Sequence, residues 1–182
     1  RAIGDGDHFI NVSRGCEVIV AMFDDLLPLP PAAAFQRIGM KLLSTIGGAS
    51  GPLIGSFFIA IGRSLDGIAE PDRGQFATAF AAGVEAIKQR GKADLGEKTM
   101  LDVLIPVSRL MLRSSADGLP LQTSCEQFSA EAERSMRATR DMIASKGRAY
   151  FLGERAIGHI DPGSKTCAVA IGAVCALLTA KE

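Results

Sequence analysis

Two aspartates separated by one glycine stand near the start of the chain, in the stretch IGDGDHFIN (residues 3–11). In a tight glycine-rich turn, the carboxylates of Asp5 and Asp7 can converge on one point, where they repel each other unless a cation lies between them. Oxygen ligands favour a hard cation such as Mg²⁺, which keeps several waters and bridges to substrate phosphates. The pattern therefore predicts a site for Mg²⁺ and phosphate.

Two other interpretations of this stretch stay open. The aspartates can instead cap a helix by accepting hydrogen bonds from its first backbone N–H groups. A zinc site made of Asp5, Asp7 and His8 would have crowded geometry. Because His8 and His159 are the two histidines of the chain, a histidine-rich transition-metal site is not expected.

A second candidate for phosphate binding is the glycine-rich stretch TIGGASGPLIG (residues 45–55). Its glycines allow backbone N–H groups to approach an anion closely, and Ser50 adds a hydroxyl. Pro52 suits the first turn of a helix, whose N-terminus attracts negative charge. The alternative is a tight interhelical turn that needs glycine only for its backbone angles.

The stretch GEKTMLD (residues 96–102) places Thr99 and Met100 at a predicted helix start. Met100 has the shape to pack against a flat ring, but core packing explains a methionine equally well. The overlapping stretch QRGKADLGEKT (residues 89–99) mixes cations and acids, which is typical of a solvated loop.

The longest polar stretch is KGRAYFLGERAIGHIDPGSKT (residues 146–166). Arg148 and Arg155 carry the planar, forked donors that suit phosphate. The turn DPG (residues 161–163) can cap the last helix of the chain. Four polar, glycine-rich loops spread along one chain indicate a site built at one end of a helical bundle.

Apolar residues recur at helical spacing through most of the chain, so the sequence predicts an all-α domain with seven recognisable helices. Short connections favour antiparallel neighbours in a bundle. We expect a single domain (residues 1–182) and a nearly all-apolar last helix deep in the core. The clearest helices cover residues 12–23, 57–65, 74–91 (closed by Gly91), 100–111, 122–147 (closed by Gly147) and about 164–180.

Composition limits the possible partners. The chain has 182 residues and is 47% hydrophobic, and its 20 Lys and Arg balance its 20 Asp and Glu, so no field attracts nucleic acid or an anionic membrane. The apolar run AVAIGAVCALL (residues 168–178) is too short to span a bilayer. We expect a cytoplasmic protein with buried, free thiols at Cys16, Cys125, Cys167 and Cys175.

Taken together, these four loops resemble the nucleotide-binding L subunit, or L domain, of dihydroxyacetone kinases. The chain follows the family motifs IGDGDHxxN, GGASGPLxG, RGKAxxGxKTMxD and KGRAxYLGERxIGHxDPG in order over essentially its whole length, the last of them with Phe151 in place of its tyrosine. The resemblance implies an antiparallel barrel of eight helices, with the nucleotide at one end. The first helix of that barrel would precede Arg1.

The resemblance also implies an activity. ADP or ATP would bind with two Mg²⁺ ions, and the γ-phosphoryl group would pass to dihydroxyacetone held on a separate K subunit. In the phosphotransferase-system form, ADP stays bound and a phosphocarrier, the M subunit, rephosphorylates it in place. Two alternatives stay open: an L domain of an ATP-dependent (glycerone) kinase with exchanging nucleotide, and an ADP-bound regulatory module that acts on a transcription factor.

Site residues follow from the same resemblance, position by position. Asp5 and Asp7 match metal ligands, and a third aspartate of the family pattern would fall before Arg1. Arg148 matches a phosphate-contacting arginine, and no catalytic base is expected because the acceptor would lie on the K subunit. The implied nucleotide-binding residues are His8, Asn11, Ala49, Ser50, Gly91, Thr99, Met100, Arg148, Asp161, Pro162 and Gly163.

Three positions depart from the family pattern. Phe9 stands where the family usually has glycine, and Phe151 interrupts the usual YLGER. Ile160 replaces a common polar residue. Phe9 adds bulk beside the expected phosphate position, but none of the matched nucleotide positions is lost.

Overall fold

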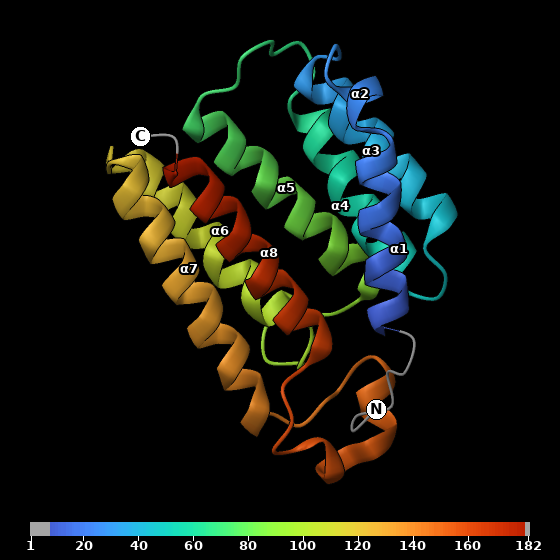
Figure 1. The fold of residues 1–182 in the computed structure, drawn as a ribbon. Coiled ribbons are helices and arrows are strands. Elements are labelled where there is room, and N and C mark those ends of the chain that lie inside the picture. The colour runs from blue at the N-terminus through green and yellow to red at the C-terminus, as the bar shows by residue number, and fades with distance from the viewer. Residues whose placement is uncertain (1–7, 181–182) are drawn as a thin grey trace. The chain divides into compact units, whose positions relative to one another are not determined.

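Figure 1 shows the fold in a computed structural model that describes residues 8–180. Within these residues the chain forms eight α-helices and two 3₁₀ segments, with no strand. The all-α class predicted from the sequence is therefore confirmed. The described chain divides into two compact units, here called the N-terminal unit (residues 8–92) and the C-terminal unit (residues 93–180).

The N-terminal unit packs its helices in sequence, with α3 against α4, α4 against α5, and α1 against α3. Helices α3 and α4 approach closely because glycines face each other: a Cβ built on Gly39 would lie 2.6 Å from the carbonyl oxygen of Gly55. The helices of this unit are α1 (His8–Ala21), α2 (Phe23–Leu26), α3 (Pro31–Thr45), α4 (Ser50–Ser64) and α5 (Arg73–Gly91).

The core of the N-terminal unit combines small aliphatic side chains with phenylalanines. The rings of Phe57 and Phe80 meet edge to face with centroids 5.2 Å apart, an arrangement that aromatic pairs favour. Helix α5 starts with a reciprocal cap, because Asp72 accepts from Gln75 N and Gln75 accepts from Asp72 N. The buried cluster consists of Ala32, Ile61, Leu65 and Ala79, with Phe35, Phe57, Ile68 and Phe76 packed against it.

The C-terminal unit packs α6 against α7 and α7 against α8, with further contacts between α6 and α8. Its central cluster consists of Val103, Val107, Ala132, Met136 and Ala168. The elements of this unit are α6 (Leu101–Ala116), α7 (Leu121–Ala138), η1 (Thr139–Asp141), η2 (Arg148–Ala156) and α8 (Pro162–Thr179).

Two helix ends differ from the sequence prediction. The helix expected over residues 122–147 ends at Ala138, because the carbonyls that follow bind the side chain of Lys98 instead of continuing the helical ladder. Helix α5 does end at Gly91, but the residue that takes the left-handed conformation is Lys92, with φ of 47°.

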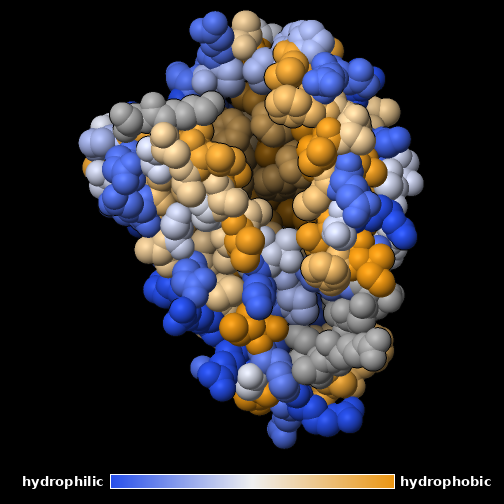
Figure 2. All heavy atoms as spheres, in the orientation of Figure 1, coloured by the Kyte–Doolittle hydropathy of each residue, from blue (hydrophilic) through white to orange (hydrophobic). Residues whose placement is uncertain are grey.

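The last helix, α8, is not deeply buried, contrary to expectation. Three of its residues are buried, namely Ser164, Ala168 and Cys175. Four of its apolar side chains are exposed, namely Val169, Val174, Leu177 and Leu178, whereas Cys167 and Ile171 pack against the core cluster of this unit. Figure 2 shows hydrophobic residues at the molecular surface beside hydrophilic ones. Among the described residues, Pro162–Thr179 is the one helix long and apolar enough to cross a membrane. Core helices of soluble proteins pass the same test, so the finding assigns no location.

The four cysteines are all free, as predicted, but they are not all buried. Cys125 and Cys175 are buried, whereas Cys16 is exposed on α1. Cys167 is half-buried as a residue, and burial of its thiol, helped by the nearby charge of Asp161, raises its pKa to about 12. These environments predict different reactivities, since the thiolate is the reactive form.

We predict that iodoacetamide at pH 8 labels Cys16 well before the other three cysteines in the folded protein. Cys167 stays protonated at this pH, because its pKa of about 12 keeps the thiolate scarce until the solution becomes strongly alkaline. Mass spectrometry of peptides after timed labelling measures the order, and labelling in urea provides the control in which all four react. Early labelling of Cys167 would contradict the burial described here.

Candidate functional site

The side chain of Lys98 is the centre of a hydrogen-bonded cluster in the C-terminal unit. Its Nζ donates to the carbonyl oxygens of Thr139 at 2.6 Å, His159 at 2.7 Å and Met142 at 3.1 Å, with a longer contact of 3.5 Å to Arg140. An ammonium group has three donors, and these three short bonds use all of them. Lys98 therefore joins the end of α7 to the segment that precedes α8.

Lys98 is 1% exposed, so the expectation of a solvated loop over residues 89–99 is wrong at this position. Burial lowers the pKa of Lys98 below its usual value, while the carboxylates of Asp161, Asp141 and Asp102 act in the opposite direction. The backbone of Lys98 has φ of 58°, which a residue with a side chain rarely adopts. Such a conformation persists where surrounding bonds impose it.

The start of α6 is fixed by a buried carboxylate. Asp102 accepts hydrogen bonds from Gly96 N at 2.5 Å and from Thr99 N at 2.7 Å, and it is 2% exposed. The hydroxyl of Thr99 in turn accepts from Leu101 N at 3.2 Å. The side chains of Asp102 and Thr99 thus both accept from backbone N–H groups around the start of α6, and the T-x-x-D spacing that favours such bonds is visible in the sequence. The predicted helix start at Thr99 and Met100 is confirmed.

The turn at residues 161–163 caps α8, as the sequence predicted. Asp161 is the N-cap residue and its side chain accepts from Ser164 N at 2.6 Å, while Pro162 occupies the first turn. A Cβ built on Gly163 would lie 3.5 Å from the Cβ and Cε of Met100, so this turn lies against Met100. Two candidate residue groups that are far apart in sequence therefore meet in one unit.

Two further hydrogen bonds join the starts of α6 and α8 and the end of α7. The buried hydroxyl of Ser164 donates to the carbonyl oxygen of Thr99 at 2.6 Å, which ties the start of α8 to the start of α6. Asp161 N donates to the hydroxyl of Thr139 at 3.0 Å, which ties the same turn to the end of α7. Three helix ends are thereby joined through polar contacts.

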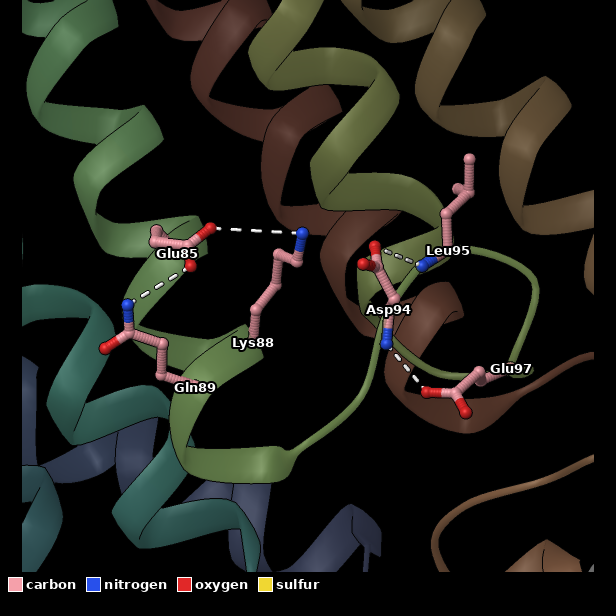
Figure 3. Close-up of polar contacts among 6 residues, drawn as sticks. All are labelled: Glu85, Lys88, Gln89, Asp94, Leu95 and Glu97. Atoms are coloured by element: carbon pink, nitrogen blue, oxygen red, sulfur yellow. Dashed lines mark hydrogen bonds and ion pairs between the residues drawn. The ribbon is translucent and has the colours of Figure 1, made fainter.

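The loop before α6 folds on itself, as Figure 3 shows. Asp94 N donates to the Glu97 carboxylate at 2.7 Å, and Leu95 N donates to the Asp94 side chain at 2.8 Å. Glu97 also accepts from the hydroxyl of Ser145 at 3.0 Å. The same figure shows Glu85 in contact with Lys88 and Gln89, an exposed set on α5. Such exposed pairs contribute little stability.

The candidate Arg148 begins η2, directly after Gly147, whose φ is 67°. Next to it the rings of Tyr150 and Phe151 meet edge to face with centroids 5.6 Å apart, and both side chains are exposed. The segment therefore presents its aromatic side chains to solvent, while Leu152 packs on a small cluster of alanines.

In the N-terminal unit, Ala49 is the N-cap residue of α4 and Ser50 its first residue. Gly48 has φ of 67°, and a Cβ on Gly51 would collide with the carbonyl oxygen of Ile46. The backbone angle at Gly48 and the close contact at Gly51 therefore both require glycine, and phosphate binding at this turn stays a prediction. Nothing in this geometry opposes an anion at the N-terminus of α4.

His8 and Asn11 lie in the first turn of α1, and Gly91 ends α5, all in the N-terminal unit. Phe9, the bulky departure beside them, is 78% exposed and so points away from the core. The predicted metal ligands Asp5 and Asp7 lie outside the described residues. Within residues 8–180, no group of three or more His, Cys, Asp or Glu side chains is arranged to hold a metal ion.

The helical fold and the order of the loop motifs define an all-α domain of the dihydroxyacetone kinase type. A protein-family model, the DAK2 domain, matches residues 2–176, and the chain belongs to this family.

Relatives of known activity agree with this assignment. The chain is 41% identical over 166 residues to the ADP-binding subunit DhaL of a PEP-dependent dihydroxyacetone kinase from Listeria innocua, covering 90% of this chain and 76% of that protein. It is 39% identical to the corresponding subunit from Escherichia coli K12, covering 90% and 78%. The crystal structure of the C. freundii dihydroxyacetone kinase with AMP-PNP and Mg²⁺ matches with a TM-score of 0.71 and 27% identity, over 96% of this chain and 28% of that one.

We predict that Asp102→Asn destabilises the protein by about 2 kcal/mol, because an amide cannot accept from both Gly96 N and Thr99 N. Urea unfolding followed by circular dichroism measures the change. Asp66→Asn is the matched control, since Asp66 is exposed, and its effect should stay within about 0.5 kcal/mol. Equal stabilities of the two variants would show that the Asp102 carboxylate does not hold the start of α6.

Proposed function

We propose that this chain is the ADP-binding subunit of a dihydroxyacetone kinase. It would pass a phosphoryl group from Mg²⁺-bound ATP to dihydroxyacetone held on a K subunit. The observation that carries the proposal is the match to DhaL subunits at 41% and 39% identity over more than three quarters of their length. The fold of a kinase solved with AMP-PNP and Mg²⁺ supports the same assignment.

The proposed metal ligands are Asp5 and Asp7, which would hold Mg²⁺ against the nucleotide phosphates. Carboxylate oxygens, here separated by one glycine in the sequence, suit this hard cation. When bound, Mg²⁺ neutralises negative charge that develops on the transferred phosphoryl group. We expect two ions in the complete protein.

The proposed phosphate-binding residues would bind the nucleotide phosphates through their position at helix N-termini and through positive charge. Ala49 and Ser50 present the N-terminus of α4, while His8 and Asn11 lie in the first turn of α1. Arg148 would stabilise phosphate through its guanidinium group. Phosphoryl transfer requires little covalent chemistry from the protein, so positioning and electrostatic stabilisation account for this role.

The remaining proposed nucleotide-binding residues include Gly91 and Met100, which match the positions about the adenosine moiety. Gly91 ends α5 in the N-terminal unit. In the C-terminal unit the candidates lie together at the starts of α6 and α8, which supports the proposal. These candidates are Thr99, Met100, Asp161, Pro162 and Gly163.

The relatives also bear on the phosphoryl donor. One DhaL relative, from Lactococcus lactis, belongs to a PTS-dependent kinase, and this chain is 39% identical to it. We therefore propose that a phosphocarrier M subunit is the donor that rephosphorylates bound ADP. We also propose that this chain is a single-domain cytoplasmic protein. The alternative is an L domain of an ATP-dependent kinase, since the C. freundii enzyme is a longer chain of which this one covers 28%.

We predict that Asp7→Asn abolishes phosphoryl transfer in the presence of the K subunit and lowers ADP affinity in Mg²⁺ by about tenfold or more. The apo protein should melt at an unchanged or higher temperature, because the substitution removes repulsion between Asp5 and Asp7. Calorimetry with ADP, with Mg²⁺ or with EDTA, measures affinity, and Asp66→Asn serves as the exposed control.

Three outcomes would oppose this proposal. Equal ADP affinity with Mg²⁺ and with EDTA would remove the metal assignment. A large fall in apo stability of Asp7→Asn would favour a helix-capping role for the aspartates instead. Turnover of dihydroxyacetone by the purified chain alone would show that no K subunit is needed.

A further inference from the structure

The burial of Lys98 and its hydrogen-bond partners are not explained by the residues next to it in sequence. Lysine is rarely buried unless it is paired, yet Lys98 is 1% exposed and has a left-handed backbone. Its partners are neutral backbone carbonyls from segments 41 to 61 residues away in sequence. A side chain that joins such distant segments fixes where they lie relative to one another.

The first of these segments is the end of α7. Thr139 is the C-cap residue of this helix, and the last carbonyls of a helix have no partner within it. The Lys98 ammonium group supplies donors to Thr139 and Met142 there, and its positive charge complements the negative end of the helix dipole. Lys98 thus caps α7 from the loop before α6.

The second segment leads into α8. The carbonyl oxygen of His159, two residues before the N-cap Asp161, accepts from Lys98 Nζ at 2.7 Å. On the other side, Lys98 is followed directly by Thr99 and Met100. The same side chain therefore sets the distance between the two residue groups that meet at the starts of α6 and α8.

We propose that Lys98 is a positioning residue for the adenosine side of the nucleotide. This inference rests on the proposed function. The packing of Met100 against the Gly163 turn depends on the placement of both helix starts, and Lys98 fixes this placement without contacting the ligand. Its bonds reach none of the proposed phosphate-binding residues, so phosphate binding should not depend on it.

The test compares Lys98→Met with Lys92→Met in the full chain. Lys92 is a matched control, since it is also a lysine with positive φ (47°) but its side chain is exposed. Methionine keeps the length of the side chain and removes its charge and donors. Calorimetry in Mg²⁺ measures the affinities for ADP and for pyrophosphate, which lacks adenosine.

We expect Lys98→Met to lower ADP affinity by about tenfold or more, because lost bonds from a charged donor release the two helix starts. Pyrophosphate affinity should stay within about twofold, and Lys92→Met should leave both affinities unchanged. Equal losses for ADP and pyrophosphate would mean a general structural role and would overturn the inference. Unchanged ADP affinity in Lys98→Met would overturn it as well.

A second variant keeps the test decisive if Lys98→Met does not fold. Lys98→Arg retains the positive charge, but its planar fork cannot direct three converging donors at three carbonyls. We expect it to fold and to lose ADP affinity while pyrophosphate affinity is kept; wild-type ADP affinity in this variant would contradict the inference. Failure of the wild-type protein to bind ADP would instead contradict the proposed function itself.

Discussion

The bonds from one buried ammonium group to three backbone carbonyls join distant segments of the C-terminal unit. Lys98 ends α7 at Ala138, holds the segment at His159, and leaves Thr99 and Met100 at the start of α6. Without these donors, buried carbonyl oxygens would lack partners, which is unfavourable in a protein interior. The bonds made by Asp102 and Asp161 act on the same segments that Lys98 joins.

Much of the fold was predictable because its determinants are local. Helical spacing of apolar residues identified the helices, and the Asp161 cap followed from short-range sequence rules that the structure confirms. The bond from Thr99 N to the Asp102 side chain could also have been inferred, since the T-x-x-D spacing is local. The family assignment rested on four loop motifs in order, and the DAK2 match over residues 2–176 confirms it.

The remaining features depend on partners far away in sequence. Composition places lysine at the surface, so nothing local predicted that Lys98 would be buried or that α7 would stop before residue 147. The exposed thiol of Cys16 and the exposed apolar side chains of α8 were missed for the same reason, because burial depends on which face meets a neighbour. Asp5 and Asp7 lie outside the described residues, so their roles as metal ligands stay predictions.

A nucleotide-binding subunit of a dihydroxyacetone kinase should retain ADP through purification. Native mass spectrometry measures this on protein that is purified by gel filtration, incubated with ADP and Mg²⁺, and filtered again. We expect a mass that exceeds the polypeptide by one ADP and its Mg²⁺, and this mass should survive the second filtration. A nucleotide-free mass after incubation would show that the chain is not such a subunit.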